Sequence, residues 1–152
     1  MQVTFHWLRV QTFCYAPERK ELIGETMTEL LGTDEFEVDV SEGEHGNTML
    51  ILSQRLTKQK EFNALFSKLG ANIRDAIVED IDNRIDEDCV FYIRLDKQKA
   101  VQGIYDIAHH GDVISITGKV QSHPARKDVA TRNMLAFLEG IVYPEETVSE
   151  SS

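Results

Sequence analysis

Residues 94–99, of sequence RLDKQK, hold the side chains best suited to binding an anion. They follow an apolar segment at once, and the donors among them are Arg94, Lys97, Gln98 and Lys99. Arginine, lysine and glutamine make many of the contacts between proteins and the phosphates of nucleic acids. The alternative is structural, with Arg94 or Lys97 paired inside the protein to Asp96 or to a neighbouring carboxylate. The residue types alone do not choose between the two.

Residues 89–138 form the net-positive part of the chain, where seven lysines and arginines stand against four aspartates, a net charge of +3. This segment adds Lys119, Arg126 and Lys127 to the candidate anion contacts. The whole chain has a net charge of −10, which argues against a protein that coats nucleic acid by charge alone. Seven cations over this length also fit an ordinary solvated face, so both interpretations stay open.

A second candidate is the glycine-containing segment EGEHGN, residues 42–47, which joins two predicted strands. It does not open a helix, so it lacks the helix N-terminus that makes such loops phosphate cradles. We therefore expect a hairpin loop, with Gly46 at positive φ. His45 and Asn47 are the candidates for a contact between this loop and a ligand.

Residues for catalysis or metal binding are harder to assemble. The chain contains no GxSxG, HExxH, Walker or GxGxxG motif. The acidic residues between Glu79 and Asp88 lack the ligand alternation and the central glycine of a calcium loop. Cys14 and Cys89 lie 75 residues apart in apolar runs, which indicates buried free thiols. We expect a protein that is not an enzyme and that needs neither a metal nor a cofactor.

The hydrophobic periodicity predicts the elements that must position these residues. Strands are expected at residues 3–14, 36–41, 49–56, 89–95 and 113–121. Helices are expected at residues 17–31, 58–83 (in two pieces) and 125–138, with a helical turn at 96–100. This order favours an α+β fold, a two-layer sandwich in which helices cover one face of a mainly antiparallel sheet of about five strands. A ferredoxin-like βαββαβ core is one way to arrange it.

Two apolar stripes specify the expected core. Phe62, Leu65, Phe66, Ile73 and Ile77 recur at helical spacing and should face the sheet. Residues 1–140 should form a single domain, followed by an acidic and flexible tail at 141–152. No apolar run approaches the ~20 residues that span a bilayer, so we expect no membrane association and a cytoplasmic protein.

Three segments, EGEHGNTMLIL, YIRLDKQKAVQG and DVISITGKVQSHP, occur in this order. Together they resemble an archaeal family of predicted RNA-binding proteins, whose members are often labelled exosome-associated subunits. The family pattern falls here on Gly43 with His45-Gly46-Asn47, on residues 94–98, and on His123-Pro124. The resemblance covers residues 3–138, and its most specific part is the LDKQ run.

The resemblance implies a fold similar to the large-subunit ribosomal protein that binds 5S RNA. It also implies a non-catalytic protein that recognises structured RNA by backbone and shape, in association with the exosome or other RNA-processing proteins. The residues expected to contact phosphate or 2′-hydroxyl groups are Arg94, Lys97, Gln98, Lys99, Lys119, Arg126 and Lys127.

The alternative function is a protein-interaction adaptor in an RNA-processing assembly, without direct RNA contact. In that case the 94–99 run is structural, and an exposed sheet edge or helix face docks a partner or a second copy, as in a homodimer. Convergence of the predicted cations on one surface favours RNA. Scattered cations with a large apolar patch favour the adaptor.

Overall fold

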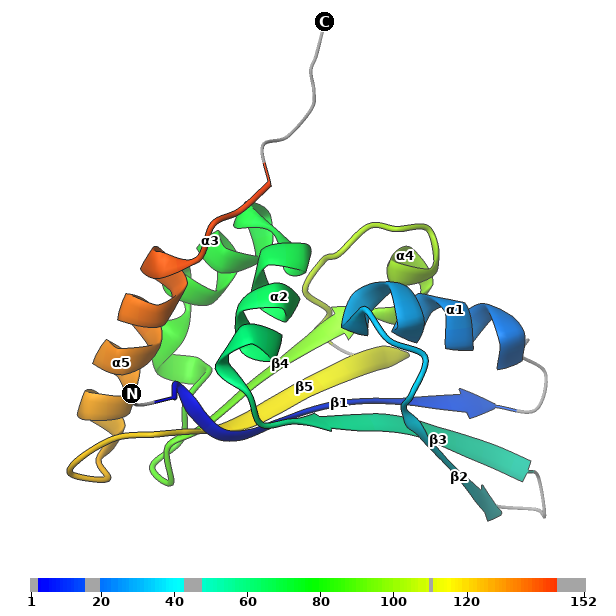
Figure 1. The fold of residues 1–152 in the computed structure, drawn as a ribbon, viewed down its shortest axis with the longest axis horizontal. Helices are drawn as coiled ribbons and strands as arrows, with labels where there is room; N and C mark the ends of the chain where they lie inside the picture. The colour runs from blue at the N-terminus through cyan, green and yellow to red at the C-terminus, as the bar shows by residue number, and fades with distance from the viewer. Residues whose placement is uncertain (1–2, 16–19, 43–47, 110, 145–152) are drawn as a thin grey trace, which may run out of the picture.

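The computed structural model describes residues 3–15, 20–42, 48–109 and 111–144 (Figure 1). The predicted loop contacts His45 and Asn47, and Gly46 with its expected positive φ, lie outside these ranges. Within them, no helix is both long enough and apolar enough to span a membrane.

The elements occur in the predicted order, with bounds that differ by a few residues. The strands are β1 (Phe5–Tyr15), β2 (Glu37–Glu42), β3 (Thr48–Leu56), β4 (Val90–Asp96) and β5 (Val113–Val120). The helices are α1 (Lys20–Leu31), α2 (Gln59–Leu69), α3 (Ala71–Glu79), the short 3-10 helix η2 (Ile81–Asn83), α4 (Lys97–Val101) and α5 (Lys127–Gly140).

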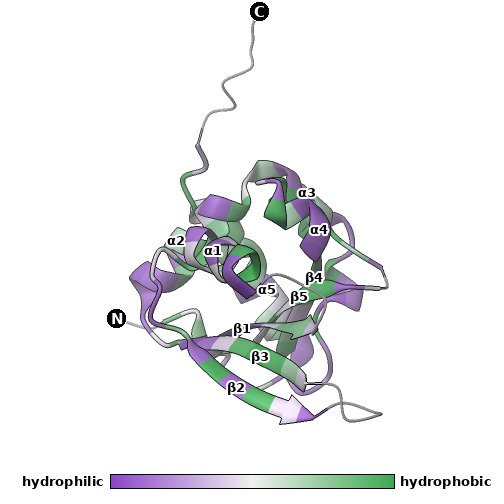
Figure 2. Cartoon of the chain, turned by 90° about the vertical axis from the view of Figure 1, so that its right-hand side faces the viewer, coloured by the Kyte–Doolittle hydropathy of each residue, from purple (hydrophilic) through white to green (hydrophobic). Residues whose placement is uncertain are grey.

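The five strands form one antiparallel sheet in the order β2-β3-β1-β5-β4. The helices lie on one side of this sheet, and no helix of the described residues lies on the other side (Figures 1 and 2). The α+β prediction is therefore confirmed. The ferredoxin-like βαββαβ arrangement describes the sheet only in part, because that unit has four strands and this sheet has five. Here β5 lies beside β1, and β4 lies beyond β5 at the edge of the sheet.

The two edges of the sheet differ. Short segments pair with the outer side of β4, where the Tyr92 amide donates to the Arg84 carbonyl at 2.9 Å and the Ala108 amide donates to the Arg94 carbonyl at 2.8 Å. At the opposite edge, β3 is the one described strand that pairs with β2, and Val40 of β2 is 71% exposed. The β4 edge of the sheet is therefore covered by short paired segments, whereas β2 forms the other edge.

The core lies between the helices and the sheet, and the expected stripe is part of it. Each member is at most 2% exposed: Phe62, Leu65, Phe66, Ile73 and Ile77. An aromatic cluster joins the layers, with ring centroids of Phe66 and Phe137 5.2 Å apart and those of Phe5 and Phe62 5.1 Å apart. Cys14 and Cys89 are both buried, as predicted.

A β-bulge in β1 decides which residues face the core. The register between β1 and β5 shifts between Phe5 and Trp7. Because a bulge adds one residue to a strand, Phe5 and Leu8 are both buried although they are three residues apart. Trp7 is left on the side that carries no helix. Gly118 of β5 lies against the bulge, and a Cβ added there would be 2.5 Å from Leu8 Cδ1 and 3.1 Å from the Trp7 carbonyl oxygen.

The chain stays packed beyond the end of α5. The Ser67 hydroxyl donates to the Val142 carbonyl at 2.8 Å, and the Tyr143 hydroxyl donates to the Leu138 carbonyl at 2.9 Å. The Arg74 guanidinium lies 4.7 Å from the centroid of the Tyr143 ring. Residues 145–152 of the predicted tail lie outside the described part of the chain.

Candidate functional site

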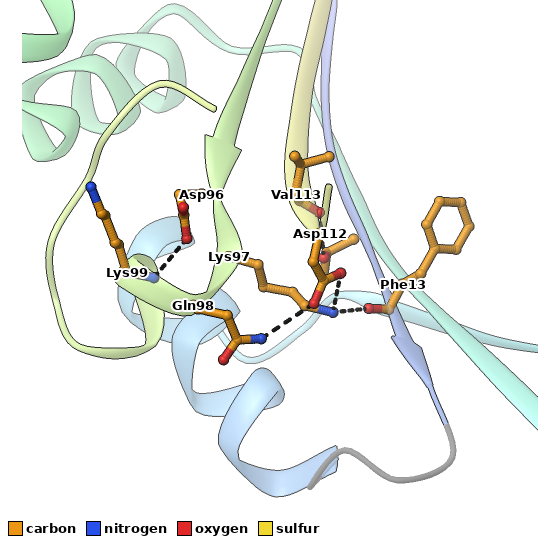
Figure 3. A network of polar contacts seen from close by, with 8 residues as sticks. Phe13, Asp96, Lys97, Gln98, Lys99, Asp112 and Val113 are labelled. Atoms are coloured by element: carbon orange, nitrogen blue, oxygen red, sulfur yellow. Dashed lines mark hydrogen bonds and ion pairs between the residues drawn. The ribbon is translucent and has the colours of Figure 1, made fainter. Parts of the chain in front are cut away.

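Lys97 does not lie on the surface. Its side chain is fully buried, and its ammonium donates to the Phe13 carbonyl at 2.6 Å and pairs with Asp112 at 2.9 Å (Figure 3). The Tyr15 ring centroid lies 5.5 Å from the same Nζ. The expectation that Lys97 is exposed and contacts RNA is therefore wrong. The reason is that α4 starts directly after β4 and turns this side chain toward the end of β1.

The rest of the LDKQ run also makes contacts within the protein. The Asp96 carboxylate caps α4 by accepting from the Lys99 amide at 3.0 Å. The Gln98 amide donates to Asp112 at 3.2 Å, and the Lys99 ammonium binds Asp106 at 2.9 Å. That last hydrogen bond raises the pKa of Lys99 above its usual value. The run therefore ties the end of β4 to β1 and to residues 106–112, as the structural alternative expects.

Arg126 and Lys127 lie at the start of α5 and have partners of their own. Arg126 donates to the Asp128 carboxylate at 3.0 and 3.1 Å, and these hydrogen bonds lower the pKa of that carboxyl. Lys127 donates to the Asp82 carbonyl at 2.9 Å and lies 4.0 Å from the Glu87 carboxylate. The groove at this place, of about 610 Å³, is lined by both cations and by the carboxylates of Asp82, Glu87 and Asp128. This mixed lining does not favour an anion.

The predicted contacts are thus not brought together. Figure 1 shows α4 and α5 toward opposite ends of the molecule, so Lys99 is far from Arg126 and Lys127. Arg94 and Lys119 lie in a third place, on the side of the sheet that carries no helix. The Lys119 ammonium donates to the Asp88 carbonyl at 2.5 Å. Arg94 is exposed and, within the described ranges, has no side-chain partner.

We call the helix-free side of strands β1, β3, β4 and β5 the open face. Cross-strand pairing places its side chains in rows: Arg55, Arg9, Thr117 and Tyr92 form one row. The next row contains Ser53, Gln11, Ser115 and Arg94. The open face has further members in other rows, which are Trp7, Lys119, Phe13, Ile51, Met49 and Tyr15. All of these residues are at least partly exposed.

Three arginines of the open face have no counter-ion among the residues that the structure describes. Arg9, Arg55 and Arg94 are exposed and form no ion pair with any residue that the structure describes. Arg9 lies directly opposite Arg55, and like charges in this position destabilise a sheet. The neighbouring carboxylates on this side belong to β2, where Glu37 is opposite Ser53 and Asp39 is opposite Ile51. A bound anion over β1 would relieve the repulsion between the two arginines.

Aromatic rings accompany these arginines. The Arg55 guanidinium lies 5.7 Å from the centroid of the Trp7 ring, and Tyr92 is 38% exposed. Trp7, Arg9, Arg55 and Tyr92 were missed by the reasoning from sequence. Alternation along residues 5–15 could have indicated that Trp7 and Arg9 share a face. Arg9 and Arg55 were overlooked because residues 1–57 have a net charge of −6. A net charge counted along the chain does not show which charges share a surface.

No metal site accompanies this surface: within the described ranges, no three His, Cys, Asp or Glu side chains are grouped to hold an ion.

A family model described as RNA binding matches residues 7–120. The chain belongs to this RNA-binding family. An RNA-binding protein of Pyrococcus abyssi is 30% identical over 145 residues, 89% of this chain and 94% of that protein. The residues matched by the RNA-binding family contain β2 to β5 and all of β1 from Trp7 onward, and they exclude α5.

Solved structures agree with this membership of the RNA-binding family. A DUF54 protein from Methanothermobacter thermautotrophicus has a TM-score of 0.74 and 27% identity, over 89% of this chain and 98% of that one. A DUF54 protein from Archaeoglobus fulgidus has a TM-score of 0.74 and 30% identity, over 88% and 99%. A UPF0201 protein from Methanococcus jannaschii, at 13% identity and a TM-score of 0.54 over 83% and 93%, is similar in fold alone.

Proposed function

We propose that this protein is a non-catalytic, cytoplasmic RNA-binding protein whose open face contacts the RNA backbone. The observation that carries the proposal is the set of three exposed arginines, Arg9, Arg55 and Arg94, without ion-pair partners in the described part of the chain. In a chain with 26 acidic residues, arginines that stay unpaired are available to an external anion. Phosphate is the anion that an RNA-binding family meets.

The spacing of the arginines suits a run of phosphates. Arg55 is on β3, Arg9 on β1 and Arg94 on β4, so they span three strand spacings. At about 4.8 Å per spacing this is roughly 14 Å, which is wider than a single phosphate group. The family match also contains all three positions, whereas it excludes Arg126 and Lys127. Backbone contact of this kind fits structured RNA, which proteins recognise mainly by shape, phosphates and 2′-hydroxyl groups.

The test is a binding titration with an RNA hairpin at several salt concentrations. The double variant Arg9→Gln/Arg94→Gln removes two phosphate contacts, so the slope of log K against log salt should flatten by about 1.4–1.8, since each contact contributes roughly 0.7–0.9. The matched control is Arg132→Gln on α5, which is also exposed and has no ion pair among the described residues. The proposal fails if the wild type shows no salt-dependent binding, or if the double variant and the control behave alike.

Two consequences of the family resemblance remain proposals: a fold similar to the ribosomal protein that binds 5S RNA, and association with the exosome or another RNA-processing assembly. Crosslinking in cell extract, followed by sequencing of bound RNA and mass spectrometry of bound protein, tests the association. The adaptor alternative, including a homodimer, predicts crosslinked protein without crosslinked RNA.

A further inference from the structure

Trp7 lies on the open face because it alternates with the buried Leu8, and the bulge that precedes it turns Phe5 into the core. Tryptophan offers a large apolar surface, of about 150–250 Å², that proteins usually bury. Here no described helix covers the indole, which is partly exposed, and the Arg55 guanidinium lies over the ring at 5.7 Å from its centroid. A flat ring of this size, next to an arginine without an ion pair among the described residues, is suited to a flat ligand with a nearby negative charge.

Tyr92 provides a second ring on the same face. It lies in one row with Arg9 and Arg55, and its strand is two spacings from β1. Two spacings are about 10 Å, so the two rings are separate contact points rather than one stacked pair. Thr117 of β5 lies between them in the row of Tyr92, and the next row carries the hydroxyl of Ser115 and the amide of Gln11. These small polar groups can donate to and accept from the edges of a base or a 2′-hydroxyl group.

We propose that the open face binds unpaired nucleotides of RNA, with one base stacked on Trp7 of β1, another on Tyr92 of β4, and the phosphates between them beside Arg9. This inference rests on the proposed function and names its substrate class. Sheets and grooves that bind single strands combine aromatic platforms with cationic side chains in this way. A fully paired duplex keeps its bases stacked on one another, so it offers the two rings nothing to contact.

The charges around the face limit where the strand lies. Glu37 and Asp39 of β2 face the same side of the sheet, on the flank of β3. They repel a phosphate there, whereas β1, β5 and β4 carry Arg9, Lys119 and Arg94. We therefore expect the RNA to cross the β1-β5-β4 part of the sheet and to leave β2 free.

Trp7 is the single tryptophan of the chain, so its fluorescence reports on this site directly. The experiment titrates the full-length protein with a ten-nucleotide oligouridylate, which has no self-structure, and with a blunt ten-base-pair RNA duplex. We expect the single strand to quench the Trp7 emission and the duplex to leave it nearly unchanged. Stacking energies of single bases correspond to about a five- to 150-fold loss of affinity when the ring is removed.

The variants Trp7→Ala and Tyr92→Leu should each weaken binding of the single strand by at least about fivefold. Tyr92→Leu is the safer of the two, because Tyr92 is more exposed and its loss is less able to disturb the fold. The matched control is Tyr143→Leu, because Tyr143 also packs against an arginine, Arg74, but lies on the helix side. Thermal melting followed by circular dichroism confirms that each variant is folded.

The outcomes separate the two proposals. If the duplex binds as tightly as the single strand, and if Tyr92→Leu binds like Tyr143→Leu, base stacking is refuted. The proposed function then survives, provided that Arg9→Gln/Arg94→Gln still flattens the salt dependence. If neither RNA binds the wild-type protein, both proposals fall together.

Discussion

At the scale of single residues, neighbouring cations in one motif differ in burial and in the direction of their side chains. Arg94 projects from β4 onto the open face, whereas Lys97, three residues later, is fully buried between the ends of β1 and β5. The sequence shows that the motif is rich in donors, and it also shows the carboxylates that compete for them. It cannot show which way Lys97 points, because that depends on α4 starting directly after β4.

Lys97→Met should lower the free energy of unfolding by about 1–3 kcal/mol. The substitution keeps the aliphatic stem, but it leaves the Phe13 carbonyl without this donor and Asp112 without its ammonium partner. Urea denaturation measures the effect. The matched control is Lys99→Met, since Lys99 pairs with Asp106 in an exposed position, and such pairs contribute about 1 kcal/mol or less. Equal effects of the two substitutions would contradict the structural role of Lys97.

At the scale of elements, strands and helices follow from periodicity because burial repeats with the geometry of each element. The paired stripes of α2 and α3, with Phe62 and Ile73 among them, are recognisable for this reason. The open face is harder to predict, because a bulge interrupts the alternation of β1 and reverses the sides of Phe5 and its neighbours. A sequence pattern with strict alternation would place Phe5 and Trp7 on the same side.

Gly118→Ala should destabilise the protein by about 1–3 kcal/mol, because an added methyl group would overlap Leu8 and approach the Trp7 carbonyl at the bulge. The melting temperature measures the change. Gly24→Ala in α1 is the matched control, since its new Cβ would meet only Phe36 Cζ at 3.9 Å. Removing a helical glycine there should instead stabilise the protein by about 0.5–1 kcal/mol. A neutral Gly118→Ala variant would show that the bulge adapts.

At the scale of the whole molecule, the charge of this acidic member of an RNA-binding family is unevenly distributed over its surface. The net charge of −10 describes the chain, but a ligand meets one face. Arg9 and Arg55 are 46 residues apart in sequence and directly opposite in the sheet. No count along the sequence brings them together, which is why the predicted basic segment contains Arg94 and Lys119 but omits the other half of the cationic surface.

Glu37→Gln/Asp39→Asn should strengthen RNA binding about fourfold at low salt. Two unit charges about 10 Å apart in water interact by roughly 0.4 kcal/mol, and the substitutions remove two such repulsions at the flank of the open face. The gain should vanish at high salt, where exposed charges are screened. Glu139→Gln on α5 is the control, because this exposed carboxylate lies on the helix side. A gain that persists at high salt would contradict an electrostatic origin.

The central position of β1 has a consequence for the dynamics of binding. Both edges of this strand are hydrogen bonded, to β3 and to β5, and its alternate residues anchor the core. Backbone of this kind opens least often, so the side chains Trp7 and Arg9 are preorganised and binding orders little of the chain. Amide hydrogen exchange should therefore be slow in β1 of the free protein and should change little when RNA is added. The surface behaves as a fixed template to which the nucleotides adapt.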